Sequence, residues 1–365
     1  MLKKGYSPQD EQQFYTVKRM DFTMKKRDIL FCLFLLIYAI FGCSYAFFSE
    51  YKLNRMLTTT FGFAHLYSFF TMICLVMLLF SLLAVAITLL KNGFKLKFDT
   101  PNLILISSMI FSMLFIFGGT GTDKLVETSR DGQTIRLVEW NVADNINEAN
   151  IRDIFGEFDA DIAVFPELGG YEKGDHSNSR LINLFKKAGI DFEKYEVYVS
   201  EPTEGSIAPV TIVIKRAFGR YNFYKKTPMT RFGTVYLSPT TKGKPSIIGL
   251  HTAPPLPGLM GIWKNDLDLI SDLSKHNKDS IIIGDFNATM KHGRLNTIKT
   301  HVDALEHAPK FNSGTWNIDI PSPFRTRIDH ILIPNNKYGV KSIELKAHSN
   351  SDHLCVFTEI QKLTN

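Results

Sequence analysis

The sequence predicts a membrane-anchored α/β protein in which three apolar helices precede one mixed α/β domain. Two observations lead to this prediction. Long uncharged apolar segments occur only in the first third of the 365 residues, and from residue 134 onward short apolar runs alternate with amphipathic stretches. The chain therefore divides into a basic cytoplasmic tail over residues 1–28, a membrane domain over 29–122 and a soluble domain over 123–365.

The charge distribution follows the same division. Residues 1–122 hold 12 basic and 6 acidic side chains, whereas residues 123–365 hold 30 of each, so the net charge of +6 comes from the membrane third. A nucleic-acid-binding domain is expected to carry its own basic excess. The sequence pI of about 8.9 is therefore no argument for DNA binding. With 45% hydrophobic residues and four cysteines, the chain is neither disordered nor a disulfide scaffold.

Three segments are candidates for membrane spans. Residues 29–48 and 66–90 are uncharged over 20 and 25 positions, which is enough for an α-helix to cross about 30 Å of hydrocarbon. Residues 103–117 are shorter, but uncharged neighbours extend them, and Pro101 suits a first helical turn. Buried core helices would show a polar stripe, which residues 66–90 lack. A cleaved signal peptide is disfavoured because Phe41 is too large for the cleavage position and further spans follow.

Basic residues set the expected orientation. They are frequent before the first span and after the second, where Lys91, Lys95 and Lys97 lie, but the loop between these spans has only Lys52 and Arg55. By the positive-inside rule the N-terminus is cytoplasmic, and a third span leaves the soluble domain outside the cytoplasm of a multi-pass cell-membrane protein. If the third segment does not span, this orientation inverts. The soluble domain contains a single cysteine, so it can form no internal disulfide.

Period-two and helical patterns predict the elements of the soluble domain. Helices are expected over residues 148–158 and 259–275. Strands are expected over residues 134–140, 161–165, 195–200, 210–215, 234–237, 246–250, 280–283, 328–333 and 355–360.

Polar residues of a few types stand at the ends of these strands. Asn, Asp and Glu in turns are ordinary, and a lone His after an apolar strand is more often structural. The repetition along the chain is the informative feature, because strand ends share a rim where loops build sites on a rigid scaffold. The residues concerned are Asn141, Glu167, His251, Asp285, Asn287, Asp329, Asp352 and His353.

The order of these motifs resembles the endonuclease/exonuclease/phosphatase superfamily, the DNase I-like class. The resemblance covers residues 134–361, and its most specific elements are the Gly-Asp-Phe-Asn motif at 284–287 and the Ser-Asp-His motif at 351–353. Within the class, the chain is most similar to a bacterial branch with N-terminal membrane spans, such as the VanJ-type glycopeptide-resistance proteins. The resemblance implies a four-layered sandwich of two β-sheets flanked by helices.

The resemblance also implies a metal site. Glu167 would be the principal ligand, and Asn141 and Asp352 would complete or support the metal shell. Oxygen ligands suit Mg²⁺, with Mn²⁺ also possible. Such a cation would stabilise the negative charge that accumulates on the phosphoryl and leaving oxygens during hydrolysis of a phosphoester.

The remaining residues would carry the reaction. The resemblance implies that His353 assists attack by water and that Asp329 holds its tautomer and orientation. Asp285 and Asn287 would orient the water and the phosphoryl oxygens, and His251 would donate to the phosphate. In family nucleases a separate Glu often pairs with the middle histidine; Glu201 and Glu204 are candidates for it, with nothing to decide between them. Asp144 lies close to, but not at, the spacing of a second acidic ligand.

Three functions remain open at this stage. The first is a phosphatase or phosphodiesterase, held at the bilayer, that hydrolyses lipid-linked or small phosphoesters. The second is an extracytoplasmic nuclease on DNA or RNA, with a phosphate groove formed by the basic residues between 215 and 231. The third is an inactive tethered binding module. The apolar loop over 253–263 could pack on the domain's own core or face a membrane. No protein partner is evident.

Overall fold

The structure is a computed structural model. It describes residues 26–48, 50–95, 100–117, 134–168, 179–201, 209–225, 228–309, 312–348 and 351–363. Most of the predicted basic tail lies outside these ranges, as do Lys97 and Glu204.

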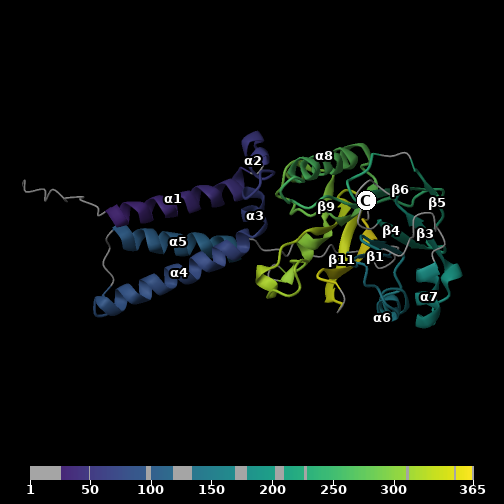
Figure 1. Cartoon of the computed structure of the whole chain (residues 1–365), viewed down its shortest axis with the longest axis horizontal. Coiled ribbons are helices and arrows are strands. Elements are labelled where there is room, and N and C mark those ends of the chain that lie inside the picture. The colour runs from purple at the N-terminus through teal and green to yellow at the C-terminus, as the bar shows by residue number, and fades with distance from the viewer. Residues whose placement is uncertain are drawn as a thin grey trace, which may run out of the picture.

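The apolar N-terminal part forms a bundle of three long helices with two short helices at one end (Figure 1). The five helices are α1 (Lys26–Phe47), α2 (Lys52–Leu57), α3 (Phe63–Ser68), α4 (Phe70–Lys91) and α5 (Thr100–Phe117). The predicted span over 66–90 begins later than expected, because residues 66–68 belong to α3 and a break at Phe69 separates α3 from α4. Two helices, over Ile29–Phe47 and Phe70–Lys91, have the length and composition needed to cross a membrane. The third apolar stretch, Pro101–Ile116, is shorter than the three-span prediction requires.

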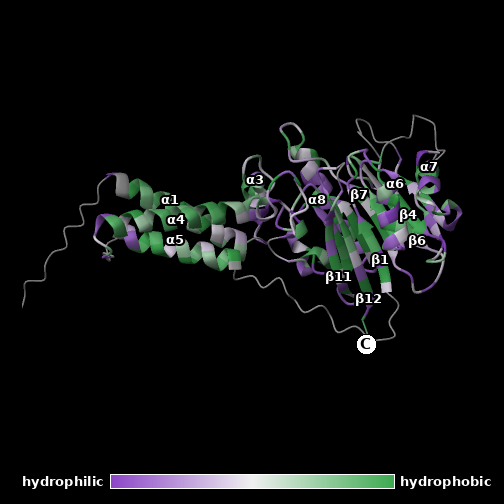
Figure 2. Ribbon diagram, turned by 90° about the horizontal axis from the view of Figure 1, so that it is seen from below, coloured by the Kyte–Doolittle hydropathy of each residue, from purple (hydrophilic) through white to green (hydrophobic). Residues whose placement is uncertain are grey.

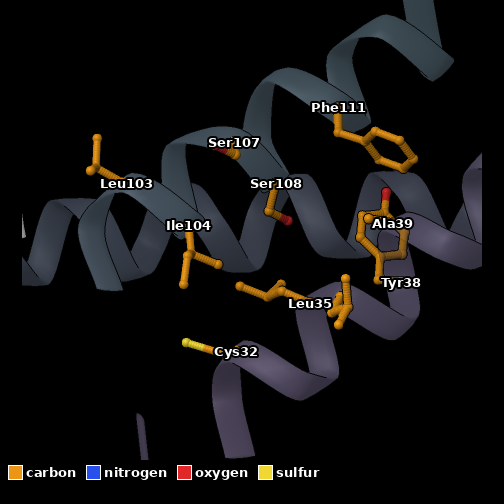
Figure 3. Close-up of a pocket in the computed structure, with 10 residues that line it drawn as sticks. Cys32, Leu35, Tyr38, Ala39, Leu103, Ile104, Ser107, Ser108 and Phe111 are labelled. Carbon is orange, nitrogen blue, oxygen red and sulfur yellow. The ribbon is translucent and has the colours of Figure 1, made fainter. Parts of the chain in front are cut away.

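The bundle has its own core, to which polar groups contribute. Tyr38 of α1 shares a 2.8 Å hydrogen bond with Ser112 of α5 and donates to Cys74 of α4 at 3.3 Å. A cavity of about 450 Å³ lies between α1 and α5 (Figure 3), lined mainly by apolar side chains. The four cysteines of the chain all lie within the described ranges, and none of them forms a disulfide.

The rest of the chain forms a sandwich of two six-stranded sheets within the described residues, with strand orders β11-β12-β1-β2-β4-β3 and β5-β6-β7-β8-β10-β9. We call them the first and second sheet. The strands are β1 (Thr134–Glu139), β2 (Ile162–Phe165), β3 (Tyr195–Val199), β4 (Thr211–Lys215), β5 (Tyr221–Phe223), β6 (Gly233–Pro239), β7 (Ser246–His251), β8 (Ser280–Asp285), β9 (His301–Asp303), β10 (Asp329–Pro334), β11 (Tyr338–Ala347) and β12 (Leu354–Lys362).

Helices cover the outer face of each sheet. Those beside the first sheet are α6 (Glu148–Ile151), continued by the short π-helix η1 (Arg152–Glu157), and α7 (Ser179–Ala188); α8 (Met260–His276) covers the second sheet. Short 3-10 turns complete the domain: η2 (Phe192–Lys194), η3 (Leu295–Thr297), η4 (Ala304–His307) and η6 (Ser322–Phe324).

Three buried layers follow from this arrangement. Alternate residues of the strands, such as Leu137 and Ile281, fill the space between the sheets. The opposite faces pack against the helices, with Phe165 on the first sheet and Ile282 on the second. Apolar residues cover the three long N-terminal helices almost continuously, whereas α8 is mixed (Figure 2). The predicted four-layered sandwich of two sheets flanked by helices is confirmed.

Some elements differ from the sequence prediction. The sequence prediction does not include strands β5, β9 and β11 or helix α7. Strands β5 and β9 have only three residues each, too few for a period-two pattern. The alternating charged and apolar residues of the edge strand β11 and the amphipathic pattern of the ten-residue α7 are signals that the prediction does not use. In the loop over 253–263, Ala253 and Trp263 are fully buried in the core beneath α8, although Leu256 is half exposed. The loop therefore packs mainly on its own domain.

Candidate active site

The predicted site residues meet at one edge of the sandwich because of strand direction. Parallel pairing of β1 with β2, and of β7 with β8, brings the carboxyl ends of these four strands to the same edge. In the second sheet, antiparallel β10 starts there, so that His251, Asp285 and Asp329 stand side by side in register. In the first sheet, β12 starts beside the end of β1 and places His353 at the same edge.

An amide and two carboxylates join the two sheets. Asn141, just after β1, donates through Nδ2 to Glu167 Oε1 at 3.1 Å and to Asp285 Oδ2 at 3.0 Å. Asn141 and Asp285 are almost fully buried, whereas the Glu167 side chain is 27% exposed. Burial, followed by the charge of Asp329, raises the pKa of Asp285 to about 7. Glu167 thus presents the accessible carboxylate of a buried acidic group.

A buried imidazole–carboxylate pair lies beside this group. The Nδ1 atom of His353 is 2.9 Å from Asp329 Oδ2 and 3.1 Å from Oδ1, so Nδ1 is the donor and Nε2 is left toward the site. His353 Nε2 lies 3.9 Å from Asp285 Oδ2 and 3.9 Å from Asp352 Oδ1. Burial by itself lowers the pKa of His353, but the charge and hydrogen bond of Asp329 outweigh it and raise the pKa to about 9.

The backbone of the Ser-Asp-His motif is also held. Ser351 Oγ donates to the Asn141 carbonyl at 2.6 Å and accepts from the His353 amide at 3.0 Å. The indole of Trp140 donates to the His353 carbonyl at 3.3 Å. Ser351 therefore links the end of β1 to the turn that carries the imidazole.

His251 is buried on the opposite side of Asp285. Its Nε2 atom lies 3.6 Å from Asp285 Oδ2, 3.7 Å from Glu167 Oε1 and 3.4 Å from Asn287 Nδ2. Burial first, and then the charge of His353, lowers the pKa of His251 to about 3. A neutral imidazole at this position keeps one N–H as a donor and adds no positive charge to the site.

Unusual backbone conformations mark the site. Glu167 and Asn287 have φ values of 57° and 46°, in the left-handed region that side chains rarely adopt. Such strain concentrates at functional positions. Gly284 is required by close packing, since a Cβ there would lie 1.9 Å from the Leu250 carbonyl oxygen. The Gly-Asp-Phe-Asn motif therefore comprises the end of β8 and the bend after it, which hold Asp285 and Asn287 in place, with Asp285 Oδ1 accepting from the Asn287 amide at 2.7 Å.

The group of donors that lies closest together differs from the metal ligands implied by the resemblance. Among the described residues, Asp285, Asp329 and His353 offer ligand atoms within 4.8 Å of one another. The resemblance implied Asn141, Glu167 and Asp352. Asp329 and His353 already bond to each other, however, whereas Glu167 faces solvent and contacts Asn141. Asp352 joins the site through His353 and accepts from Trp316.

Other sequence candidates lie elsewhere or are engaged. Lys215 and Arg216 lie at the end of β4 opposite the site and pair with Asp159 and Glu196, so they form no groove at the catalytic edge. Glu201 pairs with Lys225 at 3.2 Å and so is no evident partner for His251. Asp144 bonds to Arg180, a neighbouring cation on α7.

Sequence reasoning missed Glu139, a fully buried carboxyl below the site. Neither of its oxygens has a hydrogen-bond partner among the described residues. Burial, followed by the charges of Asp329 and Asp285, raises the pKa of Glu139 well above its usual range. Its signal in the sequence is a charge on the strand face that also carries Ile135 and Leu137, which point into the core between the sheets.

Residues 138–353 match the sequence profile described as the Endonuclease/Exonuclease/phosphatase family. The chain belongs to this family. Its members are phosphoester hydrolases that use divalent metals. A comparison with curated proteins found no match.

Three solved structures resemble the chain. The endonuclease/exonuclease/phosphatase from Beutenbergia cavernae has a TM-score of 0.47 and 15% identity, over 63% of this chain and 72% of that one. A humanized D. rerio TDP2 has a TM-score of 0.46 and 13% identity, over 62% and 98%. The human Nocturnin catalytic domain with bound sulfate has a TM-score of 0.45 and 16% identity, over 65% and 96%.

The stretch Arg-Ile-Asp-His at residues 327–330, which contains Asp329, ends in a histidine outside the candidate site. His330 is fully buried and contacts Asp303 Oδ2 at 2.8 Å through Nδ1 and the Ala288 carbonyl at 2.8 Å through Nε2. We expect His330→Ala to lower the free energy of unfolding by about 3–5 kcal/mol, because it leaves the Asp303 charge buried without its main partner. Chemical unfolding followed by circular dichroism measures this. The exposed His276→Ala is the control, expected within about 0.5 kcal/mol of wild type, and an equal loss in both variants would contradict the assignment.

Proposed function

We propose that the chain is a divalent-metal-dependent phosphatase or phosphodiesterase, anchored in the membrane, that hydrolyses lipid-linked or small phosphoesters outside the cytoplasm. The observation that carries the proposal is the meeting of Asn141, Glu167 and Asp285 with the His353–Asp329 pair at one edge of the two sheets. Acidic oxygens then face an imidazole whose orientation is fixed, which is the arrangement that metal-assisted hydrolysis requires.

The donor set fits a hard divalent cation. Among the described residues, no Lys or Arg pairs with Glu167 or Asp285, and their ion-pair partners are the histidines His251 and His353. No Lys or Arg neutralises this acidic group among the described residues, and its donors are oxygens, which Mg²⁺ and Mn²⁺ prefer. We assign Glu167, Asn141 and Asp285 as the residues that would hold the ion, with Asp352 in support.

The protein's own residues then have separate roles. A bound divalent cation supplies stabilisation of the charge that accumulates on the phosphoryl oxygens. In its neutral form, which becomes populated as the pH rises toward its raised pKa of about 9, His353 accepts the proton of the attacking water at Nε2, because Nδ1 is committed to Asp329. Asn287 and the neutral His251 lie next to Asp285, near the position where charge develops. Asn287 Nδ2 donates to His251 Nε2 at 3.4 Å, so a bound phosphoryl oxygen would have to replace this contact before either group donates to it.

Exposed apolar surface supports the membrane anchor. Outward side chains of the long helices, including Leu30, Ile37 and Leu79, are 60–70% exposed. Only 17% of the most apolar stretch of Ile29–Phe47, and 22% of that of Phe70–Lys91, is buried within the protein. A continuous apolar surface of this kind is unfavourable in water and expected in hydrocarbon.

Contacts between the bundle and the domain support three spans. The loop between α1 and α4, which includes α2 and α3, packs on the domain beside α8 (Figure 1). The His292 imidazole contacts the Ala64 carbonyl at 2.9 Å, and the Gly293 amide donates to Thr58 at 3.0 Å. These groups can meet only on one side of the membrane. Since α5 follows the loop on the other side, we infer that it crosses despite its shorter apolar stretch, so that the domain reaches α2 and α3.

We expect the C-terminus to lie outside the cytoplasm. An alkaline phosphatase fused after residue 365 should be active, whereas the same reporter fused after Lys95, between α4 and α5, should be inactive. The Lys95 fusion is the control. An active reporter after Lys95 together with an inactive one at the C-terminus would contradict the orientation.

Neutral domain charge and ion-paired basic residues favour small or lipid-linked phosphoesters over nucleic acid. The purified protein in detergent, with Mg²⁺ or Mn²⁺, should be tested on undecaprenyl pyrophosphate, phospholipids, bis-p-nitrophenyl phosphate, DNA and RNA. We expect turnover of a lipid-linked or small substrate with weak dependence on salt. Preferred cleavage of DNA or RNA, with affinity falling steeply between 50 and 200 mM salt as expected for counterion release, would support the nuclease alternative instead.

A further inference from the structure

The chain between η4 and β10 runs along the catalytic edge as a strap, which we define as residues 312–328. Its two ends are tied together, since the amide of Trp316 donates to the Thr326 carbonyl at 3.0 Å and the amide of Thr326 donates back at 2.7 Å. The middle of the strap forms η6, which packs against α4 of the apolar bundle. The strap therefore connects the site with the anchor.

The strap holds the Asp352–His353 backbone on both sides. The Leu354 amide donates to the Thr315 carbonyl at 2.8 Å, and the Ile318 amide donates to the Asp352 carbonyl at 3.0 Å. The Thr315 hydroxyl oxygen also accepts from the amide of Asp329 at 3.3 Å. The same segment thus touches both backbones that carry the imidazole–carboxylate pair.

One side chain of the strap reaches a polar group of the site. The indole N–H of Trp316 donates to Asp352 Oδ2 at 2.7 Å, and the other oxygen, Oδ1, then lies 3.9 Å from His353 Nε2. The Asp352 side chain is 44% exposed, and the indole is the donor that the structure gives its carboxylate. Without this donor, holding the half-exposed carboxylate of Asp352 in one rotamer would cost side-chain entropy that no hydrogen bond offsets.

We propose that Trp316 is a positioning residue that orients the Asp352 carboxylate toward Nε2 of His353, where Asp352 can support the metal shell. The proposal rests on the proposed function, in which Asp352 supports the metal shell. Partners that hold the groups around a metal commonly change metal affinity 10–100-fold when removed. Trp316 does not touch substrate in this assignment, so its loss should act through metal affinity and kcat and leave the KM of a small substrate nearly unchanged.

Trp316→Phe removes the indole N–H and keeps an aromatic ring. In the full-length protein in detergent, calorimetric titration with Mn²⁺ should give about tenfold weaker binding for this variant. Trp263→Phe is the matched control, because the buried indole N–H of Trp263 has no hydrogen-bond partner among the described residues, and Mn²⁺ affinity should stay at the wild-type value. Unchanged affinity in Trp316→Phe would overturn the proposal.

A double variant separates positioning from general damage. If Trp316 acts through Asp352, adding Trp316→Phe to Asp352→Ala should weaken Mn²⁺ binding no further. Independent, additive losses would overturn the proposal. Neither measurement requires turnover, so a chain that binds Mn²⁺ in this pattern but hydrolyses none of the substrates would contradict the proposed function and leave the positioning role intact.

A spectroscopic test avoids dependence on the folding of Trp316→Phe. The chain has three tryptophans, so 5-fluorotryptophan labelling gives three ¹⁹F resonances; Trp140→Phe and Trp263→Phe assign two of them, and the third then belongs to Trp316. We expect the Trp316 resonance to move when Mg²⁺ is added to wild type and to move on Asp352→Ala, while that of Trp263 stays in place. A Trp316 resonance that keeps its chemical shift both on addition of Mg²⁺ and in Asp352→Ala would overturn the proposal.

Discussion

His353→Ala is expected to lower kcat by about 10²–10⁴-fold, the usual contribution of a general base. The imidazole of His353 presents Nε2 to the site, while its Nδ1 is hydrogen-bonded to the buried carboxylate of Asp329. Alanine leaves the attacking water without a proton acceptor at the position of Nε2. The measurement is turnover of bis-p-nitrophenyl phosphate at saturating Mg²⁺ in detergent.

Asp329→Asn provides the companion variant. It disrupts the hydrogen bond that fixes the tautomer of His353, so combining it with His353→Ala should cost no more than His353→Ala alone. Near-wild-type turnover in His353→Ala would rule out the assigned mechanism. If His353→Ala also lost its cooperative unfolding transition, the fall in turnover would come from damage to the fold. Circular dichroism detects this loss.

Glu167→Gln is expected to reduce turnover by at least about 10²-fold at fixed Mg²⁺ and to raise the metal concentration needed for half-maximal activity. Glutamine keeps the size of the side chain and an oxygen acceptor for Asn141, but it removes the accessible negative charge of the acidic group. The loss should therefore be partly recovered by raising the Mg²⁺ or Mn²⁺ concentration. Titration of activity with each metal measures this.

Glu193→Gln is the matched control for this substitution. Glu193 lies exposed in η2, before the end of β3 that is opposite the site, and its loss should leave metal dependence unchanged. If Glu167→Gln kept the wild-type metal dependence and turnover, the assignment of Glu167 as a ligand would be wrong. An equal shift in both variants would point to a general effect of charge on metal attraction.

Much of the fold and of the candidate site could be predicted from the sequence. Apolar runs ended by Asn, Glu, Asp and His locate residues that the structure brings to one edge, among them Asn141, Asp285 and His353. Local patterns suffice here, because the length and alternation of a strand determine where its end residue stands.

Residues outside these patterns could not be predicted. Trp316 belongs to a stretch without periodicity, and its contact with Asp352 spans 36 positions. The break at Phe69 accompanies the packing of α3 against the domain, where Ala64 of α3 lies in the core beneath α8. Contacts of this kind join segments far apart in sequence, and no local propensity encodes them.

The sequence by itself determined the division into an apolar third and an α/β domain, the family motifs and the identity of the acidic and imidazole groups. These depend on composition and on periods of two or 3.6 residues, which each segment carries alone. Only the tertiary structure decided which groups face one another: the Asn141 amide between Glu167 and Asp285, and the indole of Trp316 on Asp352. The physical reason is that hydrogen bonds act over about 3 Å, so they depend on how the two sheets and the strap pack, not on the segments themselves.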